Sequence, residues 1–197
     1  MNKKRIKLVL GAIVLVAICA VAGYFRTYPI KLDLVTLDWE MIGEIKREGE
    51  PAPDVEFLGR AVYLDRNGWY LINIDGKFGY VSYERGPFGR HRLRNVGYGD
   101  GDFRNGIIES EGKKYLLFSG LDPREEVDKI SVEVQGFTYD LFTREVSSDL
   151  PTSPFLLCCE VDPNIKAKTV NLFDITFYDE NGNNITANYE LSGGIIQ

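Results

Sequence analysis

An apolar segment near the amino terminus constrains the fold of this chain more than any other feature. It follows the basic flank MNKKRIK and runs from Leu8 to Phe25, 18 residues without a charged side chain. With a rise of about 1.5 Å per residue, a helix of this length spans roughly 27 Å, close to the thickness of the hydrocarbon core of a bilayer. The sequence therefore predicts that residues 1–30 form a basic flank and a transmembrane helix.

The flanking charges predict the orientation of this helix. Four basic residues and no acidic residue precede it, whereas both kinds follow it. Because positively charged flanks stay on the cytoplasmic side, we expect a single-pass protein with a cytoplasmic amino terminus and with residues 31–197 outside. Two alternatives remain open. Cleavage near Ala22, at the end of the small-residue pattern AVA, would release a secreted protein. Cys19 could instead carry a lipid, although Ile18 stands where a small residue is typical.

The distribution of charge limits the partners of the outer part. Of the 23 Lys and Arg residues, four lie in residues 1–24, so the remaining 19 stand against all 29 Asp and Glu residues. A body with this acidic excess is repelled by nucleic acid and by anionic lipid, except where basic residues cluster. Nucleic acid is therefore not expected as a partner.

The three cysteines do not suggest a disulfide framework. Cys19 lies within the apolar segment, and Cys158 and Cys159 are adjacent in PFLLCCEV. Adjacent strand residues point to opposite faces, so a bridge between them would need a strained ring. Alternation predicts that Cys159 is a small core residue and that Cys158 is partly exposed. Without a C-x-x-C motif, a redox or metal role has no support.

The remaining pattern predicts a mainly β body. A short amphipathic helix is expected over residues 36–47, since acids lie in its first turn, bases lie in its last turn and Gly49 follows. Beyond residue 54 the apolar residues alternate, and turn dipeptides separate the runs, namely Asn67-Gly68, Asp75-Gly76, Glu111-Gly112 and Asn181-Gly182. We expect an antiparallel, sandwich-like domain over residues 31–197, with a subdivision near residues 121–128 as an alternative.

Three stretches carry a resemblance to a known group of proteins. They are GKFGYVSYERGPFGRHRL, KKYLLFSG and DITFYDENGNNIT. In their glycine, aromatic and turn positions these stretches resemble a loosely defined group of small, uncharacterised bacterial proteins. Members of that group have one amino-terminal membrane segment or lipid anchor and a β-rich extracytoplasmic domain. The resemblance implies a location at the bacterial cell membrane and a β architecture, and it supplies no catalytic residue.

The stretch PFGRHRLRN holds the only histidine of the chain and its densest run of arginines. On a strand, Arg90, Arg92 and Arg94 share one face, and His91 lies on the other. Guanidinium groups spaced about 7 Å apart can bind an anionic polymer or a lipid headgroup layer. The alternative is that these arginines form a solvated face and pair with acids of neighbouring strands. A catalytic role for His91 has no visible serine or cysteine partner.

A calcium site is a second hypothesis. In DENGNNITANYE, Asp179, Asn181 and Asn183 occupy the first, third and fifth positions and Glu190 the twelfth, which is the spacing of oxygen ligands in an EF-hand loop. Asn184 stands where such loops have glycine, and Asn181-Gly182 between two strand-like runs is also a typical hairpin turn. The hairpin is the alternative.

The sequence favours a non-enzymatic module that binds a protein or an anionic component of the cell envelope. Two other classes stay open. One is an envelope hydrolase that uses His91 or paired carboxylates, and the other is a structural module stabilised by calcium. No cofactor other than calcium is expected.

Overall fold

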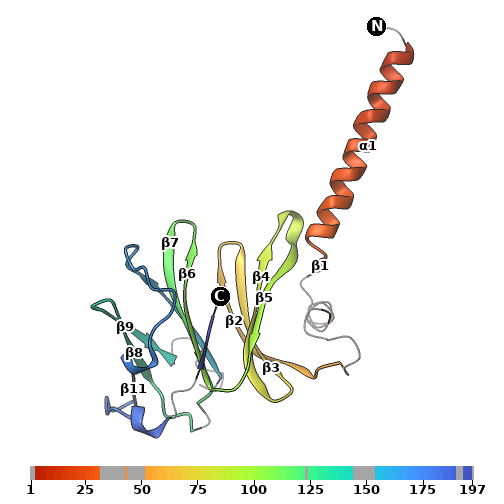
Figure 1. Cartoon of the computed structure of the whole chain (residues 1–197). Helices are drawn as coiled ribbons and strands as arrows, with labels where there is room; N and C mark the ends of the chain where they lie inside the picture. Colours follow the sequence, from red (N-terminus) through yellow and green to blue (C-terminus); the bar gives the residue numbers. More distant parts are fainter. Residues whose placement is uncertain are drawn as a thin grey trace.

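The computed structural model describes residues 3–31, 43, 52–122, 124–143, 154–189 and 193–196. Its first element is a helix, α1 (Lys3–Thr27), which projects away from a β-rich body (Figure 1). The stretch Val9–Thr27 is long and apolar enough to cross a membrane, and none of it is buried against the body. A membrane anchor and a signal sequence share these properties. The predicted apolar helix is confirmed; α1 begins at Lys3, within the basic flank, and ends two residues after Phe25.

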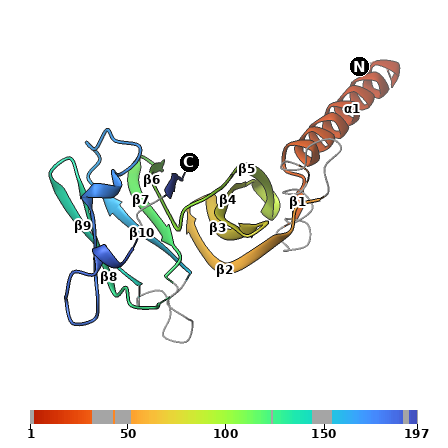
Figure 2. The same ribbon diagram turned by 60° about the horizontal axis from the view of Figure 1, so that its bottom comes forward.

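The first sheet, sheet A, has five antiparallel strands in the order β1-β5-β4-β3-β2. Its strands are β1 (Ile30–Lys31), β2 (Val55–Leu64), β3 (Asn67–Ile74), β4 (Lys77–Arg85) and β5 (Arg90–Tyr98). A short 3-10 turn, η1 (Pro87–Gly89), joins β4 to β5. Figure 2 shows that sheet A is strongly curled.

Two further sheets make up the rest of the body. Sheet B has the order β10-β7-β6-β12 and sheet C the order β11-β8-β9. The strands of sheet B are β6 (Phe103–Ser110), β7 (Lys113–Gly120), β10 (Phe155–Val161) and β12 (Gly193–Ile195). Those of sheet C are β8 (Lys129–Val134), β9 (Phe137–Phe142) and β11 (Ile175–Tyr178). Two 3-10 turns, η3 (Leu172–Asp174) and η4 (Thr186–Asn188), flank β11. All described pairings are antiparallel except that of β12 with β6.

Sheet B lies between the other two sheets and is buried on both faces. On β7, Leu116 and Phe118 face a cluster shared with sheet C, and Leu117 faces a cluster shared with sheet A. All three are fully buried. Each such side chain stabilises the fold by about 1.5–3 kcal/mol relative to an exposed one. The domain was expected to be sandwich-like, and it has three layered sheets instead. The consecutive apolar residues Leu116, Leu117 and Phe118 of the middle sheet supply two interfaces, one on each face.

The adjacent cysteines of β10 occupy the two faces of this middle sheet. Cys159 packs against the cluster between sheets B and C, and Cys158 packs against the cluster between sheets A and B. Both are half-buried free thiols. Strand alternation therefore explains the CC pair without a bridge, as predicted.

Two local predictions from the turn and alternation patterns are wrong. Asn67-Gly68 is not a turn, since both residues lie in β3 and the preceding turn uses Asp65, whose φ is 53°. Gly68 instead leaves room for the ring of Tyr83, whose Cζ atom would lie 2.6 Å from a Cβ atom at this position. Phe173 alternates with Ile175 and Phe177 in the sequence, which predicts an apolar strand face for all three, but it is 92% exposed in turn η3.

The proposed subdivision at residues 121–128 is the connection from β7 to β8. Within it, Asp122 is fully buried and accepts hydrogen bonds from the Val127 amide and the Tyr189 hydroxyl, both at 2.8 Å. Strands β10 and β12 follow this connection but pair with β7 and β6, which precede it. Chain on both sides of the segment therefore builds sheet B. The helix expected over residues 36–47 lies, apart from Gly43, outside the described residues.

Candidate functional site

Strand β5 carries the three predicted arginines, and two of them share one carboxylate. Arg92 donates to Glu84 Oε2 on β4 from Nη2 at 2.7 Å and from Nε at 3.1 Å. Arg94 forms an ion pair with the same oxygen, and the Tyr28 hydroxyl donates to Oε1 at 3.2 Å. Burial raises the pKa of the Glu84 carboxyl, but the hydrogen bond and charges of these arginines outweigh burial and leave its pKa below the ordinary value. The three groups retain one net positive charge.

Arg90 has a different environment from the other two arginines. Its Nε atom donates to the Tyr28 carbonyl at 2.7 Å, and Nη2 donates to the Pro29 carbonyl. Its guanidinium carbon lies 4.8 Å from the centroid of the Phe25 ring. Arg90 therefore joins the end of α1 to sheet A. The alternative considered for this face was that its arginines pair with acids of neighbouring strands. Arg92 and Arg94 do so, since both pair with Glu84 on β4.

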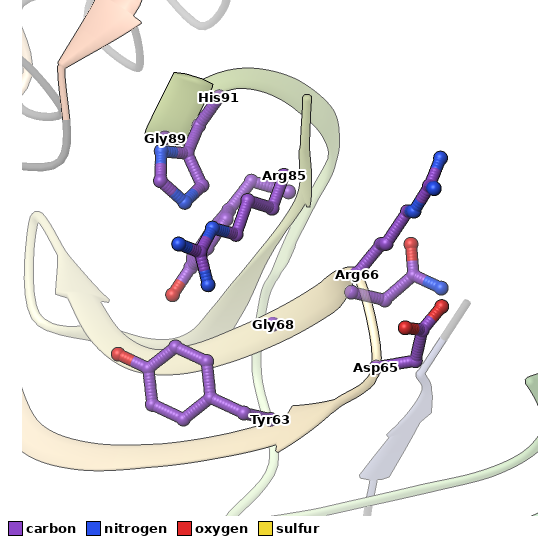
Figure 3. Close-up of a pocket in the computed structure, with 9 residues that line it drawn as sticks. Tyr63, Asp65, Arg66, Gly68, Arg85, Gly89 and His91 are labelled. Carbon is purple, nitrogen blue, oxygen red and sulfur yellow. The ribbon is translucent and has the colours of Figure 1, made fainter. Parts of the chain in front are cut away.

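His91 lies on the opposite face of β5, as predicted, in a pocket of about 460 Å³. The pocket is between the β2–β3 turn and the beginning of β5 (Figure 3). Its lining consists of Tyr63, Asp65, Arg66, Asn67, Gly68, Tyr83, Arg85, Gly89 and His91. In Figure 3, Arg85 lies near His91, whereas Asp65 and Arg66 lie across the pocket from it.

Two buried polar atoms in this pocket make no well-formed hydrogen bond among the residues that the structure describes. They are Nδ1 of His91, a residue that is 5% exposed, and the hydroxyl of Tyr83, a residue that is 1% exposed. The two rings meet edge to face, with centroids 5.3 Å apart. A buried polar atom without a partner costs about 1–3 kcal/mol, so such atoms are rare unless something else binds them.

A cluster of three tyrosines, Tyr63, Tyr70 and Tyr83, lies beside these atoms, and Tyr63 and Tyr83 line the pocket. The hydroxyls of Tyr63 and Tyr70 are hydrogen-bonded to each other, and the ring of Tyr83 is stacked on that of Tyr70 with centroids 5.2 Å apart. Burial, followed by the interactions of its hydroxyl with the hydroxyls of Tyr63 and Tyr70, raises the pKa of Tyr83 far above the ordinary value of 10. Tyr83 is therefore a neutral hydroxyl that can donate a hydrogen bond into the pocket.

The electrostatics of the pocket favour a negatively charged ligand. Burial lowers the pKa of His91 below 6.5, the charge of Arg85 lowers it further, and a hydrogen bond with the backbone of Gly89 partly opposes both. His91 is thus neutral at pH 7. Arg66 and Arg85 supply two positive charges against the single negative charge of Asp65. An anion near the imidazole would be stabilised by these charges and would favour protonation of His91.

The predicted calcium residues lie in a tight turn after β11. The Asp179 carboxylate accepts hydrogen bonds from the amides of Asn181 and Asn183 at 2.9 and 2.8 Å and from Asn183 Nδ2 at 2.8 Å. These bonds lower the pKa of Asp179. Tyr178 and Asn184 form an antiparallel bridge, which is the arrangement of the hairpin alternative. Glu190 lies outside the described residues.

An acidic hollow borders the same turn. Glu125, Glu126, Glu180 and Asp179 line it together with Asn181 and Ile185. Within the described ranges, no group of three or more His, Cys, Asp or Glu side chains has an arrangement suited to holding a metal ion. The calcium hypothesis for Asp179, Asn181, Asn183 and Glu190 stays a prediction.

Comparisons with protein-family models, with curated proteins and with solved structures gave no match for this chain. What stands is the coarser part of the resemblance, namely an apolar amino-terminal helix followed by a β-rich body.

Sequence reasoning found His91 but missed the residues that surround it. Tyr83 precedes Arg85 by two positions, so alternation places both on one face of β4. The antiparallel pairing of Arg85 with His91 then brings that face to the histidine. The signal was therefore present in YERGPFGRHR, once β4 and β5 are aligned as a hairpin. The β2–β3 turn contributes Asp65 and Arg66 to the pocket, and no sequence pattern predicts that these residues lie near His91.

Proposed function

We propose that this protein is a non-enzymatic, membrane-anchored module of the bacterial cell envelope that binds a phosphate-bearing ligand in the His91 pocket. The amino terminus is cytoplasmic, α1 is a retained anchor, and the β body is outside the cell. The observation that carries the proposal is a pair of buried polar atoms without a well-formed hydrogen bond, His91 Nδ1 and the Tyr83 hydroxyl, in a pocket with two arginines.

Phosphate chemistry suits these groups. A phosphate offers several acceptor oxygens, which can bind the guanidinium of Arg85 and the hydroxyl of Tyr83 at the same time. Neutral His91 can present an N–H to another oxygen. Asp65 and Asn67 across the pocket are suited to bind hydroxyl or amino groups attached to the phosphate.

The position of the pocket favours an envelope component as the ligand. Gly89 and Arg85 belong to the pocket and border the β4–β5 tip, which contacts the last turn of α1. A phosphodiester of a lipid headgroup and a phosphoester of a soluble or polymeric envelope component share the chemistry that the pocket recognises. Binding tests can separate these two sources.

The test is isothermal titration calorimetry on the full-length protein in phosphatidylcholine nanodiscs. The probes are inorganic phosphate, sn-glycerol 3-phosphate and dihexanoyl phosphatidylglycerol. We expect at least one probe to bind, and we expect Tyr83→Phe and Arg85→Gln each to weaken it tenfold or more, about 1.4 kcal/mol. The matched control is Lys113→Gln, which removes an exposed ion pair between Lys113 on β7 and Glu160 on β10. This variant should bind the probes as the parent does.

The outcomes discriminate between sources and can overturn the proposal. Tighter binding of the lipid than of glycerol phosphate assigns a headgroup, and the reverse assigns a water-soluble phosphoester. Absence of heat with all three probes, or equal binding by the parent and both pocket variants, contradicts the proposed site. The intact mass of the protein from membranes tests the anchor, because cleavage near Ala22 would remove residues 1–22.

A second candidate function is an envelope hydrolase, and the neutral, buried imidazole of His91 is the observation in its favour. A general base in such a site is normally oriented by a second group. Among the described residues, His91 Nδ1 donates to no side chain that could orient the ring in this way. Turnover of a phosphodiester probe by the parent, lost in His91→Asn, would favour the hydrolase over the binding module.

A further inference from the structure

The β4–β5 tip exposes an aromatic side chain in an unusual backbone conformation. Phe88, in the middle of turn η1, is 93% exposed and has a φ of 58°. Non-glycine residues adopt this left-handed conformation rarely, and they keep it where surrounding contacts impose it. An exposed phenyl ring held in this way contributes nothing to the core, so its role lies outside the body.

The tip is attached to the last turns of the apolar helix. The Tyr24 hydroxyl donates to the Pro87 carbonyl, and the rings of Tyr24 and Phe88 meet edge to face with centroids 5.8 Å apart. Tyr24 belongs to the candidate membrane span Val9–Thr27. Aromatic residues at the end of a span lie at the level of the lipid headgroups. Phe88 is therefore at the same depth as the end of the span.

Several contacts fix this arrangement. Tyr28, directly after α1, packs so closely on Gly86 that a Cβ atom there would lie 2.5 Å from its ring. The Tyr28 hydroxyl also donates to Glu84, and its carbonyl accepts from Arg90. Strand β1 then pairs Ile30 with His91. The tip and the helix end therefore move as one unit.

From this geometry we propose that the β4–β5 tip inserts into the outer leaflet, with Phe88 at the boundary between the headgroups and the acyl chains. The inference rests on the part of the proposed function in which α1 is a retained anchor. Lipid is the partner that covers the exposed Phe88 ring, because this ring contacts Tyr24 of a helix that itself lies in lipid. Arg85 and Arg90 flank the tip at the level of the phosphates, so their charges complement anionic headgroups. The body is thereby held on the membrane surface, with the entrance of the His91 pocket close to it.

The experiment measures the depth of spin labels in nanodiscs of phosphatidylcholine and phosphatidylglycerol. A nitroxide is attached to Phe88→Cys in a Cys19→Ala background, and its collision rates with oxygen and with a water-soluble nickel complex are compared. Phe173→Cys is the matched control. Phe173 is also an exposed phenylalanine in a three-residue 3-10 turn, but this turn directly precedes β11 of sheet C and not the β4–β5 tip. Val14→Cys, within the span, reports on the anchor.

We expect the label at position 88 to collide at least fivefold less with nickel than the label at position 173. An aqueous label at position 88 beside a lipid-embedded label at position 14 overturns the inserted tip and leaves the anchor intact. An aqueous label at position 14 overturns both. The calorimetric test of the pocket is independent of either result, so failure of the ligand site and failure of the inserted tip are distinguishable.

Discussion

The imidazole of His91 and the phenol of Tyr83 meet edge to face on the wall of one pocket, with 5.3 Å between ring centroids, and each has a buried polar atom that makes no well-formed hydrogen bond among the described residues. The relationship depends on the β4–β5 pairing, which sets Tyr83 opposite Leu93 and Arg85 opposite His91. It also depends on β3, where Gly68 gives the Tyr83 ring its space. The proposed site is thus a product of the curled sheet.

Substitution of Gly68 should damage both the fold and the pocket. In Gly68→Ala the new methyl group would meet the Tyr83 ring at 2.6 Å, so the ring must move. We expect a loss of about 1–3 kcal/mol in the free energy of unfolding and loss of probe binding. Chemical denaturation and calorimetry measure the two effects. Tyr83→Phe keeps the ring and removes only a hydroxyl that makes no well-formed hydrogen bond, so it should retain stability and lose affinity. An unchanged Gly68→Ala protein would contradict this packing.

Glu84→Gln should destabilise the protein because it leaves Arg92 and Arg94 close together without their shared carboxylate. The expected loss is about 1–3 kcal/mol at pH 7, measured by denaturant unfolding. Since the folded pKa of Glu84 is depressed, its contribution is complete above the unfolded value of 4.5 and disappears as the pH falls through the folded pKa. The parent and variant should therefore converge in acid. Glu160→Gln, in an exposed pair with Lys113, should cause no measurable change.

The adjacent cysteines should remain reduced and unreactive in the folded protein. Burial raises the pKa of Cys158 to about 12, with a further contribution from Cys159, and raises that of Cys159 to about 11. At pH 7.5 fewer than about one thiol in a thousand is ionised. In a Cys19→Ala background, maleimide should label neither residue until guanidinium is added, when mass spectrometry should show two adducts. Rapid labelling of the native protein, or a mass two units low from a disulfide, would contradict their burial.

Calcium should not change the thermal stability of the protein if the turn after β11 is self-sufficient. The Asp179 carboxylate already accepts three hydrogen bonds from Asn181 and Asn183. The melting temperature should therefore be the same in EDTA and in millimolar calcium. A rise with calcium that is lost in Asp179→Ala would instead support the EF-hand-like spacing that ends at Glu190.

The sequence predicted the classes of element well and their assembly only in part. Alternation in PFLLCCEV placed Cys158 and Cys159 on opposite faces of their strand, and the basic flank with its apolar run predicted α1. The three-layer arrangement was not predicted, because the two buried faces of β7 produce a continuous apolar run that has no period. Asn67-Gly68 was misassigned as a turn because the glycine is required by a ring on a neighbouring strand, a contact between residues 15 positions apart.

The candidate site was predicted least well. Arg90, Arg92 and Arg94 do share a face, but Glu84 and the carbonyls after α1 bind them, and these partners come from other elements. His91 was recognised as unusual, yet its pocket needs the β2–β3 turn, whose position depends on how sheet A curls. Local pattern fixes which face a side chain occupies, whereas a pocket depends on which strands meet.

The most direct test of the phosphate site is an NMR titration of the His91 imidazole in the full-length protein. His91 is the only histidine of the 197 residues, so its ring signals need no assignment. Without ligand, the account predicts a pKa below 6.5; with saturating sn-glycerol 3-phosphate or dihexanoyl phosphatidylglycerol, it predicts a shifted ring signal and a higher pKa, because an anion favours the imidazolium. A titration curve that is identical with and without every phosphate probe would contradict the central claim.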